Sequence, residues 1–407
     1  MSPQAPDWLA DLRPGCWVRI SGDRPDLGLA ATPAGSRYLA DGDPARDPAL
    51  NPAVSLRERL RRLAGRSPLA PWSGRLGFAA ITEAWNGAVF ASSFGSGGSM
   101  IVFGGGHTDY YGSDVHAFDL QTREWRRLTD GFVAGGTDAY GAGAVYPTAT
   151  YPDGSPLPPH TYNYLQYDAG GNNLLLFKGQ LELGPNVRPA AIPHLLNLDR
   201  LQWRRGPQLP GATIESAGFT AWDSRRRLFW GHSGDAGGGN VFAAFSPDGD
   251  NPDGTVGHWV FRATNRFRGA ADHNAMTWDP ERDRLLVCVA SRNQVCEIDP
   301  GEPAAAPREL RVRAAGGCTL RECAALEYAP ALGAPVYYSA CDGATVYSLE
   351  PAAGGQRGRQ EWRWVVRTSR ANALDPVADA RSQSGFETNA SHTFGRMRVA
   401  AFAGIDV

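Results

Sequence analysis

The sequence lacks several features that would assign it to a common functional class. It contains no run of 18 apolar residues, so no segment is predicted to span a membrane. Basic residues (40) and acidic residues (42) nearly balance and lysine is scarce, which removes the basic surface expected of a nucleic-acid-binding protein. The N-terminus has no basic segment followed by an apolar one, as a signal peptide would. We therefore expect a cytoplasmic location, with a mature secreted form as the alternative.

Sequence motifs for zinc fingers, nucleotide binding and serine hydrolysis are also missing. None of the six cysteines lies in a CxxC pair with zinc-finger spacing, and we expect most of them to be buried small side chains, with a local disulfide such as Cys318–Cys323 as the alternative. The stretch GGGHTDYYG (104–112) has no lysine, so it is not a phosphate loop and no nucleotide cofactor is expected. No GxSxG motif occurs where a strand would turn into a helix.

Glycine (49) and tryptophan (12) are abundant, which is typical of short strands joined by turns. A pattern of four strands recurs every 45 to 60 residues or so: an entry strand ending in an aromatic residue, an apolar strand, a strand ending near Asp, and an edge strand with Trp. Such a repeat predicts the blades of a β-propeller. The predicted entry strands are 83–90, 160–168, 215–223, 273–280, 322–330 and 392–399.

The sequence accordingly predicts one all-β domain, a six-bladed propeller closed by an N-terminal strand. Closure of the ring protects sheet edges that would otherwise pair with other chains. Two segments do not fit the repeat: the extension 23–76, which contains one predicted helix at 54–65, and the loop 130–159, which we interpret as a lid. The predicted blades are 78–129, 160–207, 212–264, 271–314, 321–368, and 391–407 completed by the closing strand 15–22.

A family resemblance supports this fold. The Gly-Gly after the second strand, the Asp near the end of the third and the Trp of the fourth resemble kelch repeats. The stretches IVFGGGHTDYYGSDVHAFDL, DGSPLPPHTYNYLQY and SHTFGRMR resemble kelch-type propellers of bacteria and phages, to which galactose-oxidase-like propellers are more distantly similar. The tyrosine–cysteine pattern of the copper-radical relatives is not matched here, although Cys323 occupies a channel position.

Histidines from distant parts of the chain converge at one mouth of the predicted channel. The entry strands can be aligned on Phe90, Tyr167, Trp222, Trp278, Tyr328 and Val399. Positions seven and five residues earlier then lie at the mouth where these strands begin. Imidazole and carboxylate suit one divalent transition metal (Zn, Fe, Mn or Cu). The predicted ligands are His107, His160, His392 and Glu83. The alternative is a polar channel in which these side chains bind each other or water.

Other polar and aromatic residues at this mouth are candidates for chemistry and binding. A tyrosine can act as a general acid or base, and a guanidinium can bind a carboxylate. The predicted catalytic residues are Tyr110, Tyr111, Tyr162 and Arg396. The predicted substrate-binding residues are Trp85, Asp109, Lys178, Glu215, His232, His273, Arg321 and Arg398. For each of them, packing or solvent exposure is the alternative role.

These features favour an enzyme that acts on a small polar or anionic, carbohydrate-like substrate. Lyase, isomerase, cyclase and oxygenase chemistry all stay open, because a fold does not determine a reaction. The alternative is a non-catalytic module that binds a glycan or a peptide. A scaffold role ranks last, since it gives no reason for the converging histidines. The expected partner is a small molecule or glycan, with neither nucleic acid nor membrane involved, and the oligomeric state is not predicted.

Overall fold

The fold is described from a computed structural model of the 407-residue chain. The structure describes residues 5–11, 13–17, 20, 81, 86–104, 113–129, 150–151, 153–156, 158–177, 191–210, 218–233, 241–264, 267, 273–313, 317–352, 360–368, 376, 393–402 and 405–406. No helix among these residues is long and apolar enough to cross a membrane.

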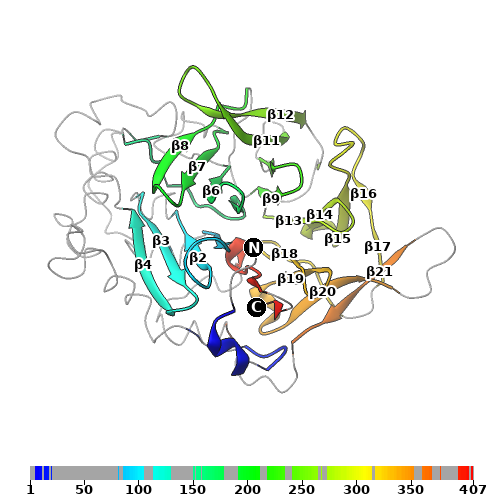
Figure 1. Cartoon of the computed structure of the whole chain (residues 1–407). Coiled ribbons are helices and arrows are strands. Elements are labelled where there is room, and N and C mark those ends of the chain that lie inside the picture. The colour runs from blue at the N-terminus through cyan, green and yellow to red at the C-terminus, as the bar shows by residue number, and fades with distance from the viewer. Residues whose placement is uncertain are drawn as a thin grey trace, which may run out of the picture.

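Five sheets follow one another around a common centre and form a β-propeller (Figure 1). Within each sheet the consecutive strands pair antiparallel, from the innermost strand outward. Blade 1 contains β1 (Ala88–Ala91), β2 (Ser99–Val102), β3 (Val115–Asp119) and β4 (Glu124–Thr129). Blade 2 contains β5 (Leu165–Asp168), β6 (Asn173–Leu176), β7 (His194–Asn197) and β8 (Gln202–Arg205). Blade 3 contains β9 (Phe219–Asp223), β10 (Leu228–His232), β11 (Val241–Asp250) and β12 (Val256–Thr264).

The last two blades are linked by a strand that changes sheet. Blade 4 contains β13 (Ala275–Asp279), β14 (Arg284–Val289), β15 (Gln294–Ile298) and β16 (Arg308–Glu309). Blade 5 contains β18 (Ala325–Ala329), β19 (Ala334–Tyr338), β20 (Val346–Pro351) and β21 (Glu361–Val366). One residue after β16, the chain continues as β17 (Arg311–Arg313), which pairs parallel with β21. The stretch predicted as a single edge strand of blade 4 therefore joins blade 4 to blade 5.

Burial differs between the inner and outer strands of a blade, because both faces of an inner strand meet neighbouring blades. The inner strand β13 and the second strand β19 are buried along their whole length. The outermost strand β12 alternates between exposed and half-buried side chains along most of its length, as a strand with one solvated face does. Among the described residues, apolar core layers lie between blades 1, 2 and 3, between blades 3 and 4, and between blades 4 and 5. A further apolar cluster joins blade 1 to the N- and C-terminal segments.

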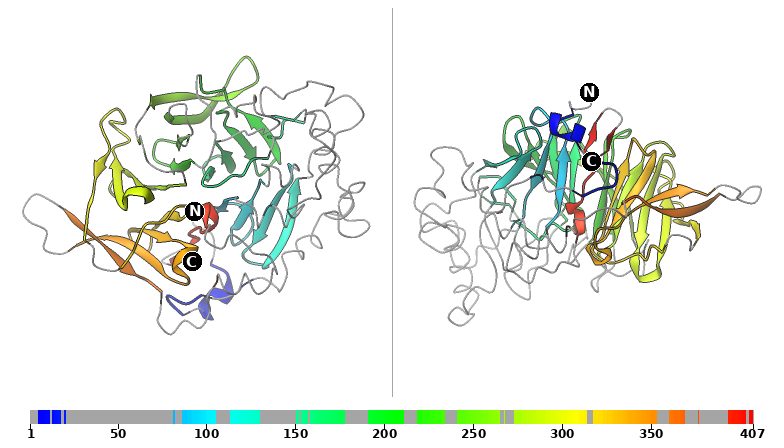
Figure 2. Two further views of the ribbon diagram at one scale, coloured as in Figure 1. Left: turned by 180° about the vertical axis from the view of Figure 1, so that it is seen from behind. Right: turned by 90° about the horizontal axis from the view of Figure 1, so that it is seen from below.

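The sixth place in the ring of inner strands is filled by a short turn. The inner strands β1, β5, β9, β13 and β18 pack in that order, each against the next. The 3-10 helix η5 (Phe394–Arg396) packs against both β18 and β1, and so closes the ring. This helix lies in the segment that was predicted as the sixth entry strand. Figure 1 and the left view of Figure 2 both show the C-terminal segment beside the centre of the ring.

The prediction of six blades is wrong, since the described residues form five. Among the described residues after η5, the strands are β22 (Ala401–Phe402) and β23 (Ile405–Asp406), which pair as a two-stranded sheet and not as a four-stranded blade. Gly15, Cys16 and Trp17, the first residues of the predicted closing strand, are not in a strand.

The N-terminal segment lies between blades 5 and 1 without completing a sheet (Figure 2). The indole of Trp17 donates to the carbonyl of Ala344 at 2.7 Å and contacts the ring of Tyr338. The 3-10 helix η1 (Asp7–Asp11) lies at blade 1, where the indole of Trp8 donates to the carbonyl of Leu120 at 2.8 Å. The gap is therefore filled by side chains and turns instead of a sixth sheet.

The aspartate after the terminal aromatic residue has a structural role at the other end of the inner strands. Asp168, Asp223 and Asp279 are buried, and their carboxylates accept backbone N–H groups of the following turn. Arginines then link blades: Arg227 pairs with Asp168 of blade 2 at 2.8 Å, and Arg226 contacts the carboxylate of Asp283 in blade 4. The aromatic–Asp pattern thus marks a turn whose carboxylate joins neighbouring blades.

The two segments outside the repeat are only partly within the described residues. The predicted helix 54–65 lies outside them, as does most of the predicted lid loop. The end of that loop is packed: Tyr151 and Ser155 are buried, and the hydroxyl of Ser155 donates to that of Ser113 at 2.9 Å. Thr150 lies 2.9 Å from the imidazole of His194 in blade 2. The end of the loop is therefore fixed to blades 1 and 2.

Candidate functional site

Part of the predicted histidine-rich mouth lies among the described residues. His160, Tyr162, His232, His273, Arg321, Arg396 and Arg398 are described, whereas Glu83, Trp85, His107, Asp109, Tyr110, Tyr111, Lys178, Glu215 and His392 lie outside the described residues. Within the described part of the chain, no group of three or more His, Cys, Asp or Glu side chains is placed to hold a metal ion. Three of the four predicted ligands are outside that part, so the metal site stays a prediction.

Two of the predicted residues meet across the axis of the propeller. Tyr162 precedes β5 of blade 2 and His273 precedes β13 of blade 4, and these blades are not neighbours in the ring. Their ring centroids lie 5.2 Å apart. Nδ1 of His160 is 3.4 Å from the hydroxyl of Tyr162, and the two rings meet edge to face. The three side chains therefore form one cluster, with His160 and Tyr162 buried and His273 half-buried.

The backbone at this cluster is held in an unusual conformation. Tyr162 has φ 41°, His273 has φ 67° and Cys323 has φ 61°, and all three stand five residues before the aligned aromatic residue of their blade. A positive φ is unfavourable for residues with a β-carbon, so neighbouring contacts must hold it. The N–H of Cys323 donates to the carbonyl of His273 at 2.8 Å. Equivalent residues of blades 2, 4 and 5 therefore form a strained layer at this mouth.

An acidic residue that the sequence interpretation missed lies near the same mouth. Asp342, in the 3-10 helix η4 (Ala340–Asp342) after the second strand of blade 5, is 3.9 Å from Nε of Arg321. Burial raises the pKa of Asp342, and Arg321 partly opposes this effect. Arg321 itself is about half exposed, at 48%. The same place in the repeat of blade 1 holds His107 and Asp109, and this equivalence is the signal that could have identified Asp342.

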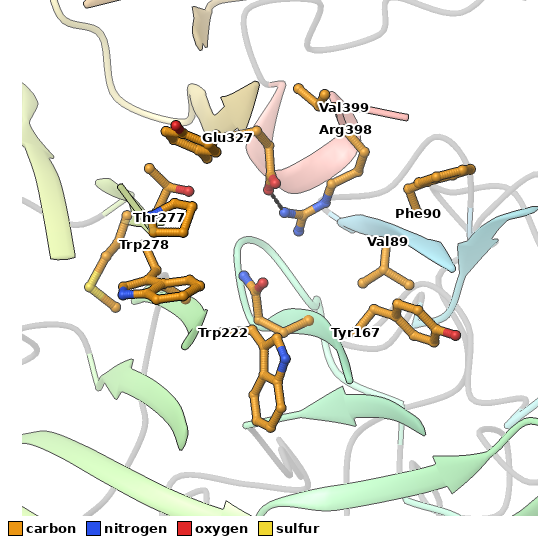
Figure 3. Close-up of a pocket in the computed structure, with 14 residues that line it drawn as sticks. Val89, Phe90, Tyr167, Trp222, Thr277, Trp278, Glu327, Arg398 and Val399 are labelled. Carbon is orange, nitrogen blue, oxygen red and sulfur yellow. Dashed lines mark ion pairs between the residues drawn. The ribbon is translucent and has the colours of Figure 1, made fainter. Parts of the chain in front are cut away.

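Arg396 and Arg398 hold the ring together from inside. Nε of Arg396 donates to the carbonyl of Asn86 at 2.8 Å. Arg398 donates to the carbonyls of Ala88 in β1 and Leu165 in β5, and forms an ion pair with Glu327 of β18 (Figure 3). Burial lowers the pKa of Arg398 to about 9, which leaves it protonated at neutral pH. These contacts connect blades 1, 2 and 5 to the C-terminal segment.

His232 lies in an aromatic layer. Its ring stacks on Phe219 at 4.6 Å between centroids and meets Phe267 edge to face at 5.5 Å. It is buried at the end of β10 in blade 3, the blade between those that contain Tyr162 and His273. These ring contacts are packing contacts, and its predicted role in substrate binding stays a prediction.

The cysteines are free thiols in this structure, so the Cys318–Cys323 disulfide does not form in it. Burial raises the pKa of the Cys323 thiol to about 12 and that of Cys318 also to about 12. Burial also raises the pKa of Cys288. Cys288 and Cys323 are the two buried cysteines, so the expectation that most of the six are buried is wrong. Because the thiolate is the reactive form of cysteine, these side chains are poor nucleophiles at neutral pH.

Comparisons with known proteins add little to this geometry. No family model matches the chain, and a search of curated proteins finds no match. Among solved structures, a chain of a nidogen/laminin complex is 11% identical with a TM-score of 0.40, covering 70% of this chain and 86% of that one. A periplasmic gluconolactonase of Pseudomonas aeruginosa is 11% identical with a TM-score of 0.37, covering 68% and 70%. At such TM-scores the similarities support no argument about activity, and the propeller rests on the sheets themselves.

Proposed function

We propose that this propeller is an enzyme that converts a small polar or anionic, carbohydrate-like substrate at the mouth formed by His160, Tyr162 and His273. One observation carries the proposal: a tyrosine and a histidine from opposite blades meet at 5.2 Å on left-handed backbone, with a second histidine 3.4 Å from the tyrosine hydroxyl. Strained polar residues that converge from separate blades are typical of functional sites.

The chemistry proposed for the cluster is proton transfer by Tyr162. Its hydroxyl gives or takes a proton at the substrate, and Nδ1 of His160 is near enough to exchange that proton. Arg321 of blade 5 stands at the repeat position that His160 occupies in blade 2. It is half exposed and supplies a guanidinium for an anionic group of the substrate. Asp342, whose pKa is raised, is a second acid near that guanidinium.

A metal ion is part of the proposal under one condition. If His107, His392 and Glu83 join His160, a divalent transition metal bound there would polarise the substrate. Metal analysis of protein expressed with added Zn, Fe, Mn or Cu tests this version. A stoichiometric metal in the wild type that is lost in His160→Ala supports it, and a metal-free wild type with full activity removes it. The kelch resemblance and the cytoplasmic location likewise stay predictions.

The experiment for the proposal is turnover by the whole chain. Neutral hexoses, hexuronates and short oligosaccharides of each are incubated with wild type, Tyr162→Phe and Tyr338→Phe, and the products are followed by NMR and mass spectrometry. Tyr338 is the control because it is a buried tyrosine of blade 5, away from the cluster in the chain, whose hydroxyl donates to the carbonyl of Gly343 at 3.1 Å. Saturable binding of a sugar without any product would favour the second candidate, a glycan-binding module.

A further inference from the structure

A cavity lies at the end of the channel where the inner strands finish. Its volume is about 250 Å³, and its walls come from β1, β5, β9, β13, β18 and the C-terminal segment. All six residues on which the repeats were aligned line it: Phe90, Tyr167, Trp222, Trp278, Tyr328 and Val399. The repeat thus places an aromatic residue at this cavity in all five blades.

The channel between this cavity and the Tyr162–His273 cluster is occupied by side chains. The amide of Asn163 donates to the carbonyls of Asn274 at 2.9 Å and Ala324 at 3.3 Å, which reaches from blade 2 to blades 4 and 5. Three residues further along the chain, the amide of Gln166 donates to the carbonyl of Thr220 at 3.0 Å. The cavity is therefore a separate site, and what binds there does not rest on the proposed function.

The charges of the side chains that line the cavity nearly cancel. Glu327 and Arg398 line it and form an ion pair with each other, as the dashed line in Figure 3 shows. Thr277 and Gln166 add a hydroxyl and an amide. A charged ligand would have to compete with the existing ion pair, whereas hydroxyl groups can hydrogen-bond to a carboxylate, an amide and a hydroxyl without separating it.

An arginine guanidinium already lies near the ring of each of two tryptophans in the cavity wall. The guanidinium of Arg227 lies 5.8 Å from the ring centroid of Trp222, and that of Arg225 lies 5.7 Å from Trp278. A second cation against these rings would meet positive charge close by, so an ammonium ligand is disfavoured. The rings still offer apolar surface, which packs well against C–H groups.

We propose that this cavity binds one uncharged sugar ring, a pyranose. A pyranose combines hydroxyl groups for Glu327, Thr277 and Gln166 with an apolar C–H face for the indoles of Trp222 and Trp278. The cavity holds about 250 Å³, just below the usual range of ligand sites, and so suits a single ring better than a longer chain.

Titration of the full chain with defined sugars tests the proposal. Methyl glucopyranoside, galactopyranoside and mannopyranoside are compared with glucuronate and glucosamine by calorimetry and tryptophan fluorescence. At least one neutral pyranoside is expected to bind with a Kd of about 1 mM or tighter. Thr277→Val removes a hydroxyl at nearly constant volume and should raise that Kd about tenfold. Trp222→Leu should raise it as well, and Trp125→Leu, a partly buried tryptophan of the outer strand β4, should leave it unchanged.

Each possible outcome decides the proposal. Binding that weakens in Thr277→Val but is unchanged in Tyr162→Phe supports a pyranose site at this end of the channel. Tighter binding of glucuronate or glucosamine than of the neutral sugars overturns it, as does the absence of binding by any pyranoside. Binding that is lost in Tyr162→Phe and retained in Thr277→Val overturns it too, and assigns the sugar to the other mouth.

Discussion

Replacement of Arg398 by methionine tests how the ring is closed. Arg398 is 7% exposed and holds two backbone carbonyls, of Ala88 and Leu165, besides the carboxylate of Glu327. Methionine keeps the unbranched apolar stem of the side chain but removes the guanidinium and with it every donor. Both carbonyls belong to buried residues, and Glu327, 22% exposed, would lose its counter-ion.

The expected loss in the free energy of unfolding is about 3 to 5 kcal/mol, the range found when one partner of a buried ion pair is removed. The partial exposure of Glu327 argues for the lower half of that range, because water can solvate its carboxylate. In Arg398→Met/Glu327→Leu the uncompensated carboxylate is gone as well, so part of the loss should be recovered.

Urea unfolding, followed by fluorescence and circular dichroism, measures these differences. Arg363→Met is the matched control, because Arg363 also faces a glutamate, Glu350 at 3.8 Å, but is 51% exposed on the outer strand β21. Its substitution should change stability by less than about 0.5 kcal/mol. If Arg398→Met cost less than about 1 kcal/mol, the ring would not depend on this arginine and the account of its closure would be wrong.

Three further predictions concern pH and packing. Burial lowers the pKa of His194 from 6.5 to about 3, so between these pH values only the unfolded chain binds this proton. The free energy of unfolding should therefore be about 2 kcal/mol lower at pH 5 than at pH 7. Urea unfolding at both pH values should show this loss in the wild type and not in His194→Gln. Asp223→Ala removes a buried acceptor of two backbone N–H groups and should lower the free energy of unfolding by about 3 kcal/mol. Asp250→Ala, which breaks an exposed ion pair, should leave it nearly unchanged. Equal urea midpoints of the two variants would contradict the structural role of the Asp223 turn. A β-carbon on Gly218 would lie 1.8 Å from the carbonyl oxygen of His232, so Gly218→Ala should lower the melting temperature markedly and Gly301→Ala should not.

The repeat was predictable from the sequence because each strand leaves a local signal. The alternation of polar and apolar residues at the start of 361–366 (EWRWVV) and the aromatic–Asp pair that ends at Asp223 are properties of neighbouring residues. The structure contains β21 and the turn after β9 at these places. The alignment on Trp222 and Trp278 is likewise matched by one ring of residues around a common cavity. The period of the repeat and its turn residues were therefore sufficient to predict the propeller and to align its inner strands with one another.

The number of blades and the details of the site depended on contacts between distant residues. Nothing in HTFGRMRV distinguishes an entry strand from the turn η5 that packs between β18 and β1. The switch of β17 to blade 5 depends on pairing with β21, about 50 residues later in the chain. The contact between Tyr162 and His273 needs blades 2 and 4 to face each other across the axis, and only the convergence of the entry strands suggested it.

The most direct test of the proposed function is the ratio of turnover rates between wild type and Tyr162→Phe on whichever sugar of the panel is converted. If the Tyr162 hydroxyl transfers the proton, the rate should fall by about 10²-fold or more, the usual contribution of a general acid or base, while the melting temperature and the rate of Tyr338→Phe stay near those of wild type. Equal rates in wild type and Tyr162→Phe, or a wild type that binds a sugar but forms no product, would contradict the account.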